Sequence, residues 1–118
     1  MLERKLRLYI AGPITKGDQL ANVRRAIEIG NDLAQAGFAV YIPHLNALWH
    51  LLYPQGKEFW YSHDNEWLLV CDAVFRLKGE SVGADAEVAL AREHGIAVYE
   101  ERPEGWHGIR DLLEAVRA

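Results

Sequence analysis

The stretch CDAVFRLKGESVGADAEVALAREHGIAVY, residues 71–99, decides the fold of this chain. Its pattern predicts an apolar strand at 73–77, a turn at 78–83, a helix at 84–94 and a second strand at 96–99, which together form one β-α-β unit. On helical spacing, a stripe of small apolar residues (Ala84, Val88 and Ala91) faces the sheet, and Glu87 borders that stripe. We expect this carboxylate to be paired or used, because charged groups are seldom buried otherwise.

The first part of the chain repeats this alternation. Apolar runs at 6–11 and 38–42 predict two further strands, and each run is stopped by a proline. Between them, the spacing predicts a helix that begins after an Asp18 N-cap and ends at Gly37. Strands and helices in this order favour a parallel sheet with helices on both faces.

The remaining segments are less regular. Residues 44–56 contain a possible helical turn and have the length of a functional loop or lid. Residues 57–70 predict a helix, and the chain ends in another helix with an apolar stripe at Ile109, Leu112, Leu113 and Val116. The fold class expected is α/β: a single three-layer, flavodoxin- or Rossmann-like domain over residues 1–118, with a short parallel sheet of about four to five strands flanked by helices.

Composition excludes several classes of function. The net charge is −4 over 118 residues, so we expect neither a nucleic acid polymer nor a membrane surface as partner. A single cysteine, Cys71, leaves no internal disulfide and favours a reducing compartment, and the charged N-terminus resembles neither a signal peptide nor a membrane span. We therefore expect a cytoplasmic protein. The five histidines show no metal-binding spacing, so we expect no metal and no cofactor.

Ligands of such sheets bind beyond the carboxyl ends of the strands. This rule brings together the loop after the first strand, the segment that follows residue 42 and the turn after residue 77. The candidate substrate-binding residues there are Gly12, Pro13, Ile14, Thr15, Lys16 and His44. Thr15, Lys16 and nearby backbone N–H groups are suited to hold an anion, although an ordinary strand-to-helix turn explains the first loop equally well.

Ser81, Gly83 and Glu87 form a tighter group around the predicted turn. Gly83 would let the backbone approach a ligand, Ser81 supplies a hydroxyl, and the helix N-terminus would keep Glu87 ionised, as a nucleophile requires. The alternative is that Glu87 only pairs with Arg92 or caps backbone N–H groups.

Asp64 and Asp72 are the candidates for a second carboxylate. Asp72 at a strand start often only orders a turn, and Asp64 would equally suit a solvated helix face. Among the many aromatic residues, we expect Trp67 in the core, whereas those near residues 44–56 are suited to stack on a planar base.

Three of these segments also carry a family resemblance. The sequences YIAGP at 9–13, DNEWLLVCDAVF at 64–75 and SVGADAEVALAREHGIAVY at 81–99 resemble the nucleoside 2-deoxyribosyltransferase superfamily, which includes 2′-deoxynucleoside 5′-phosphate N-hydrolases. The resemblance covers nearly the whole chain in order, and its most specific part is Ser-x-Gly-x-x-x-Glu.

The resemblance implies a role for each matching residue. Glu87 would be the nucleophile that attacks the anomeric carbon, and Asp64 would assist the sugar and the leaving base. Tyr9 would lie at the pocket, and Ser81 would contact a phosphate. The resemblance also implies a small-molecule nucleoside or nucleotide as partner and a homodimer or higher homo-oligomer.

One loop departs from the family pattern. The hydrolases carry a Gly-Ser-Ile-Arg-Gly-Gly type of phosphate loop, whereas residues 12–17 here read Gly-Pro-Ile-Thr-Lys-Gly, so Lys16 offers a point charge in place of the arginine fork. The function expected is cleavage of the N-glycosidic bond of a (2′-deoxy)nucleoside or its 5′-monophosphate through a glutamyl-glycosyl intermediate, ending in hydrolysis or base transfer. The alternative is a non-catalytic nucleotide-binding or sensing module on the same fold.

Overall fold

The structure, a computed structural model, describes residues 4–102, so the helix predicted near the C-terminus lies outside the described residues. Strands and helices alternate along the chain as predicted. In order they are β1 Arg7–Ala11, α1 Gln19–Gln35, β2 Ala39–Tyr41, the 3-10 helix η1 Pro43–Leu45, α2 Asn46–Leu52, α3 Lys57–Leu68, β3 Ala73–Arg76, α4 Val82–Glu93 and β4 Ala97–Glu100.

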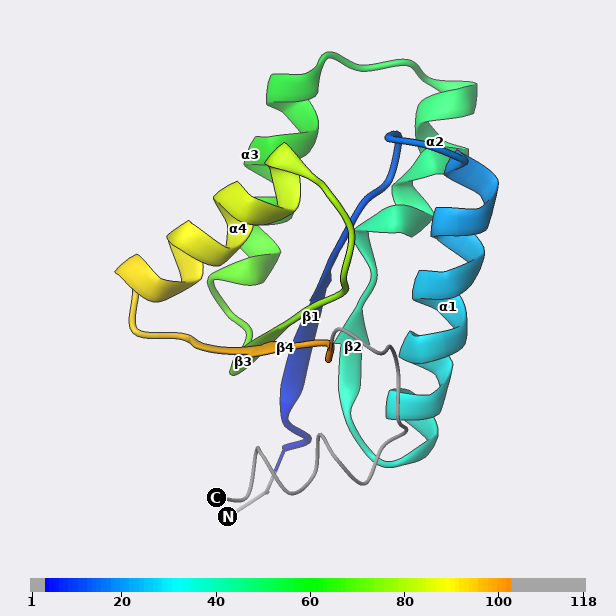
Figure 1. Cartoon of the computed structure of the whole chain (residues 1–118). Helices are drawn as coiled ribbons and strands as arrows, with labels where there is room; N and C mark the ends of the chain where they lie inside the picture. Colours follow the sequence, from blue (N-terminus) through cyan, green and yellow to red (C-terminus); the bar gives the residue numbers. More distant parts are fainter. Residues whose placement is uncertain (1–3, 103–118) are drawn as a thin grey trace.

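The four strands form one parallel sheet in the order β2-β1-β3-β4. Helix α1 covers one face of this sheet, and α3 and α4 cover the other (Figure 1). The arrangement confirms the predicted three-layer α/β fold, with four strands. Because β1 lies between β2 and β3, the residues that follow these three strands gather at the same edge of the sheet.

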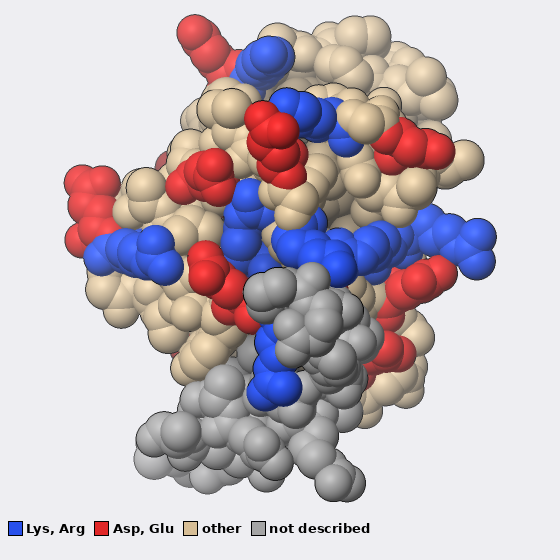
Figure 2. All heavy atoms as spheres, in the orientation of Figure 1, with Lys and Arg blue, Asp and Glu red and all other residues tan. Residues whose placement is uncertain are grey.

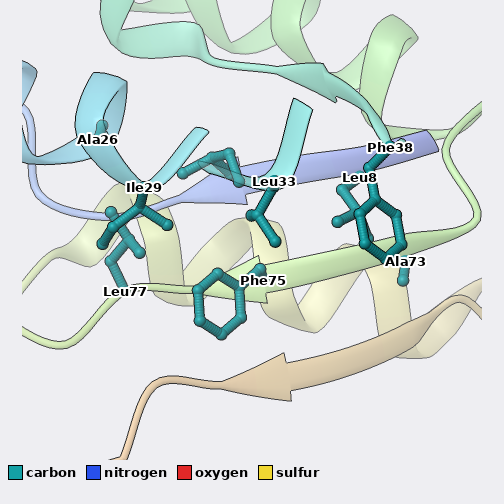
Figure 3. Close-up of a cluster of buried hydrophobic side chains, with 9 residues drawn as sticks. Leu8, Ala26, Ile29, Leu33, Phe38, Ala73, Phe75 and Leu77 are labelled. Carbon is teal, nitrogen blue, oxygen red and sulfur yellow. The ribbon is translucent and has the colours of Figure 1, made fainter. Parts of the chain in front are cut away.

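Alternate residues of each strand enter separate cores on the two faces of the sheet. On the α1 face, Figure 3 shows Ile29 and Leu33 directed from the helix onto the strands. This cluster comprises Leu8, Ile10, Ala26, Ile29, Leu33, Phe38, Ala73, Phe75 and Leu77. The second cluster, on the α3 and α4 face, comprises Tyr9, Ala11, Leu68, Val74, Ala84 and Ala91. The predicted stripe of α4 is confirmed, since all three of its residues are buried.

Side-chain caps decide where two helices begin. The Asp18 carboxylate accepts a hydrogen bond from the Ala21 N–H, which confirms the predicted N-cap of α1. The Ser81 hydroxyl accepts from the Ala84 N–H at 3.1 Å, so α4 begins at Val82, two residues earlier than predicted. Gly83 therefore lies inside the helix, and the turn uses Gly79, whose φ of +121° is the left-handed conformation that favours glycine.

Two expectations about the middle of the chain are wrong. Trp67 is not in the core: half of its surface is exposed, and its ring stacks on that of Tyr41. Residues 44–56 are largely helical rather than a loop, since η1 and α2 occupy most of them. Within residues 4–102, no helix is both long enough and apolar enough to cross a bilayer.

Candidate active site

Two tyrosines from neighbouring strands lie side by side on the face of the sheet that α3 and α4 cover. Tyr9 of β1 and Tyr41 of β2 are register partners, and their rings stack with centroids 5.4 Å apart. Tyr9 is fully buried, whereas Tyr41 is partly buried and stacks in turn on Trp67 at 5.9 Å. The two phenol hydroxyls reach two different carboxylates.

The first carboxylate is Glu87, which lies on α4 and accepts a hydrogen bond from the Tyr9 hydroxyl. Burial raises the pKa of Glu87 to about 7, and the charge of Asp64 adds to the rise, while the Tyr9 hydrogen bond and the charge of Arg76 oppose it. The expectation of a firmly ionised carboxylate is therefore wrong. Glu87 is the sixth residue of α4, beyond the first turn where the helix dipole acts, and desolvation decides its charge. Glu87 accepts its hydrogen bond from Tyr9, whereas the alternative interpretation of the sequence paired it with Arg92.

The second carboxylate is Asp64, which is buried on α3 rather than part of a solvated face. Its Oδ1 accepts from the Tyr41 hydroxyl at 2.9 Å and from Nδ2 of Asn46 at 2.8 Å. Burial raises the pKa of Asp64, and these two donors oppose the rise. The described residues donate hydrogen bonds to Oδ1 of Asp64 but none to its Oδ2.

The two carboxylates influence each other. The negative charge of Asp64 contributes to the raised pKa of Glu87, so the state in which both are ionised is disfavoured. Near neutral pH, Glu87 is therefore partly protonated. The ionised form of Glu87 can attack a substrate, and Oδ2 of Asp64 can exchange a hydrogen bond or a proton with it.

The loop after β1 packs against other turns of the sheet edge. Gly12 is buried, and a Cβ there would lie 2.9 Å from Cβ of Leu77. The carbonyl of Ile14 accepts from Asn22, and Nζ of Lys16 lies 2.8 Å from the Glu80 carboxylate in an exposed ion pair. Thr15 is exposed.

His44 contacts this loop through its imidazole ring. It is fully buried, and its Nε2 donates to the carbonyl of Pro13 at 3.0 Å if that nitrogen carries the proton. Burial lowers the pKa of His44 to about 4, so the ring is neutral at physiological pH. Its Nδ1 is buried without a hydrogen-bond partner in the part of the chain that the structure describes. His44 thus contacts the loop rather than the two carboxylates.

Ser81 and Gly83 lie at the start of α4, one to two turns before Glu87. The Ser81 hydroxyl is engaged as the helix cap, and a Cβ on Gly83 would lie 3.7 Å from the ring of Tyr61. The structure thus brings together Tyr9, Asp64 and Glu87. The neighbouring sheet edge contains the loop residues, His44, Ser81 and Gly83. The binding roles of that second group stay predictions.

Asp72 has a structural role, as one of the two interpretations of its position in the sequence predicted. It pairs with Arg4 at 2.7 Å and accepts from the backbone N–H of Arg7, and the Arg4 hydrogen bonds lower its pKa to about 2. It precedes β3, at the sheet edge opposite to the loops. The part of the chain described here gathers no three His, Cys, Asp or Glu side chains that could hold a metal ion together.

Three residues near the carboxylates were not predicted: Tyr41, Asn46 and Arg76. Tyr41 and Asn46 hold Asp64, and Arg76 is a buried cation at the end of β3. A usable signal was present for each, because all three are polar residues at or just beyond the carboxyl end of a predicted strand.

Comparisons with known proteins agree with this fold. A family model described as "Domain of unknown function (DUF4406)" matches residues 6–100. The structure is similar to a 2-deoxyribosyltransferase from the psychrotolerant bacterium Bacillus psychrosaccharolyticus, with a TM-score of 0.60 and 22% identity over 91% of this chain and 78% of that one. It is also similar to a conserved protein from Enterococcus faecalis V583, with a TM-score of 0.67 and 20% identity over 96% of this chain and 75% of that one. No curated protein matches the sequence significantly.

Proposed function

We propose that this chain, which belongs to the DUF4406 family in the deoxyribosyltransferase-like group, cleaves the N-glycosidic bond of a nucleoside or nucleoside 5′-monophosphate, with a 2′-deoxy sugar preferred. The observation that carries the proposal is the pair of carboxylates, Glu87 and Asp64, each held by a tyrosine hydroxyl from one of two register-paired strands. The similarity to a 2-deoxyribosyltransferase supports this class of substrate.

In the proposed reaction, an oxygen of Glu87 attacks C1′ of the sugar. The bond between C1′ and the base nitrogen breaks, its electron pair leaves with the base, and a glutamyl-glycosyl ester forms. Oδ2 of Asp64 accepts a hydrogen bond from a sugar hydroxyl, or relays a proton from the solvent to the departing base. Water or a second base then attacks C1′, the ester bond between C1′ and Glu87 breaks, and its electron pair returns to the Glu87 carboxylate. The proton of the attacking water or base passes to Asp64, and a free sugar or a new nucleoside is released.

The proposed nucleophile needs to be ionised. The Tyr9 hydroxyl favours that state by donating to Oε2 of Glu87, against the burial that raises the pKa to about 7. We therefore expect the rate to increase with pH as Glu87 loses its proton near neutrality.

A 5′-phosphate, where the substrate has one, would bind at the neighbouring sheet edge. Among residues 4–102, Lys16 pairs with the exposed carboxylate of Glu80, and such exposed pairs contribute little, about 0–1 kcal/mol. A phosphate can therefore replace Glu80 as the partner of Lys16 at small cost. The Ser81 hydroxyl, which already accepts one hydrogen bond as a cap, still has a proton to donate.

We also propose that the protein is a homodimer or higher homo-oligomer that associates through α2. Residues 43–56 contain no charged side chain, and α2 exposes several large apolar ones (Leu48, Trp49, Leu51 and Leu52). Figure 2 shows that the end of the molecule where α2 lies in Figure 1 carries little charge. Sedimentation velocity on the wild type and Leu51→Lys tests this: we expect a dimer or larger species that dissociates in the variant, and a wild-type monomer contradicts it.

One experiment tests the activity. The protein is incubated with ribo- and deoxynucleosides and their 5′-monophosphates, with and without a second free base, and released or exchanged base is measured by chromatography. We expect release by the wild type and by Glu93→Gln, an exposed control on the same helix, but not by Glu87→Gln. Full activity of Glu87→Gln contradicts the mechanism. If no compound is cleaved but one raises the melting temperature, the chain is instead a non-catalytic binding module.

A further inference from the structure

Arg76, the last residue of β3, has a buried side chain with only 10% of its surface exposed. Its guanidinium makes three contacts. It donates to the carbonyl of Leu77, to the carbonyl of Gly79 at 3.0 Å and to Oδ1 of Asp85 at 3.0 Å. Two of these acceptors belong to the β3–α4 turn and the third lies in the first turns of α4. The planar guanidinium of Arg76 therefore connects β3, the β3–α4 turn and α4 through its hydrogen bonds.

The sheet register places Arg76 on the same face as the two carboxylates. Val74 is paired with Tyr9 and belongs to the core under α3 and α4, and Arg76 follows Val74 by two residues. Asp85, the ion-pair partner of Arg76, precedes Glu87 by two residues on α4. The position of α4 over Tyr9 is thus tied to the position of the guanidinium.

Charged and titratable groups from four neighbouring elements interact with Glu87. They are Tyr9 of β1, Tyr41 of β2, Asp64 of α3 and Arg76 of β3. Three of these groups are neutral or negative, so Arg76 is the member of the set that attracts an ionised carboxylate. Because Arg76 is itself buried, water screens this attraction less than it would at the surface.

We propose that Arg76 is a positioning residue for Glu87, one that fixes α4 through its three contacts and supplies the positive charge that favours the ionised carboxylate. This inference rests on the proposed role of Glu87 as the nucleophile. Arg76 does not touch the reacting atoms in this scheme: it acts through the turn, through Asp85 and through its charge.

Three variants separate the charge of Arg76 from its geometry. Arg76→Met keeps the length of the side chain but removes both the charge and the fork. Arg76→Lys keeps the charge but loses the planar fork. The matched control is Arg25→Met, because Arg25 also pairs with a buried carboxylate, that of Glu101, but lies on α1 on the opposite face of the sheet.

The first measurement follows the side-chain carboxyl carbon of Glu87 by NMR over a pH series, with its signal assigned from its absence in Glu87→Gln. We expect Arg76→Met to move the titration midpoint up, because the charge of Arg76 opposes the raised pKa of Glu87. Arg76→Lys and Arg25→Met should leave the midpoint near that of the wild type. An unmoved midpoint in folded Arg76→Met overturns the proposed charge effect.

The second measurement is the rate of glycosidic cleavage. We expect Arg76→Lys to lower kcat by roughly tenfold with KM little changed, because a small misplacement of a catalytic group is costly. Wild-type kcat in Arg76→Lys overturns the positioning role even if Arg76→Met fails to fold. The NMR titration needs no substrate, so a protein that cleaves no nucleoside refutes the proposed function, whereas an unmoved midpoint refutes the inference about Arg76.

Discussion

Replacement of Glu87 by glutamine should stabilise the folded protein at neutral pH while it removes activity. In an unfolded chain, this carboxyl titrates near its ordinary pKa of 4.5, whereas burial raises the pKa to about 7 in the folded state. Between these two values the folded state retains a proton that the unfolded state has released, so the free energy of unfolding falls as pH rises. This contribution is fully present below 4.5 and is lost above 7.

The size of the effect follows from the two pKa values. Each pKa unit is worth about 1.4 kcal/mol, so the difference between 4.5 and about 7 corresponds to about 3 kcal/mol. Glutamine cannot ionise, and its side-chain oxygen can still accept the Tyr9 hydrogen bond. The unfolding free energy of Glu87→Gln minus that of the wild type should therefore increase by about 3 kcal/mol between about pH 4.5 and pH 8.

Urea denaturation followed by circular dichroism across this pH range measures that difference. Groups that titrate in both proteins, such as His44 and Asp72, largely cancel from it. Glu93→Gln is the control, because Glu93 is exposed at the end of the same helix, and its stability curve should run parallel to that of the wild type. If the stability curves of the wild type and Glu87→Gln also run parallel, burial does not raise the pKa of Glu87. That result would contradict the argument that desolvation decides its charge.

Three further predictions concern the surroundings of the carboxylates. Tyr9→Phe removes the hydrogen bond that favours ionised Glu87, so the acid limb of the pH–rate profile should move up by about one unit, as steady-state kinetics would show. Asn46→Ala removes one of the two donors to Oδ1 of Asp64, so NMR titration should show a higher Asp64 midpoint, and an unchanged midpoint would contradict the described contact. Gly12→Ala introduces a Cβ 2.9 Å from that of Leu77 and should cost about 1–3 kcal/mol in urea denaturation, whereas Gly56→Ala, with nothing within 4 Å, should not show this steric cost.

The sequence predicted most of the fold because its strands are short apolar runs stopped by Gly or Pro. The parallel sheet, the Asp18 cap and the buried stripe of α4 are all local patterns, and the structure confirms them. The start of α4 just after Ser81 was harder to predict from the sequence. A serine between a strand and a helix suits a turn and an N-cap equally well, and the hydrogen bond to Ala84 decides between them.

The contacts inside the site depend on strand order, which no local pattern contains. Tyr41 lies beside Tyr9 because β2 pairs with β1, and Arg76 faces α4 because β3 pairs with the other edge of β1. The charge of Glu87 was mispredicted for a related reason. Its place on the helix was readable from spacing, but its burial depends on how closely α4 packs on the sheet.

The central position of β1 also has a consequence for the order of events during synthesis. This strand leaves the ribosome before the other three strands, yet one of its two neighbours in the sheet, β3, begins only at residue 73. At about 5–20 residues per second, β1 waits roughly 3–13 s for that partner, and Tyr9 waits longer still for the helix that carries Glu87. In this interval the apolar strand is open to chaperones and to other nascent chains. The residue that orients the proposed nucleophile is thus made well before the rest of its site, which can form only after β3 and α4 have been made.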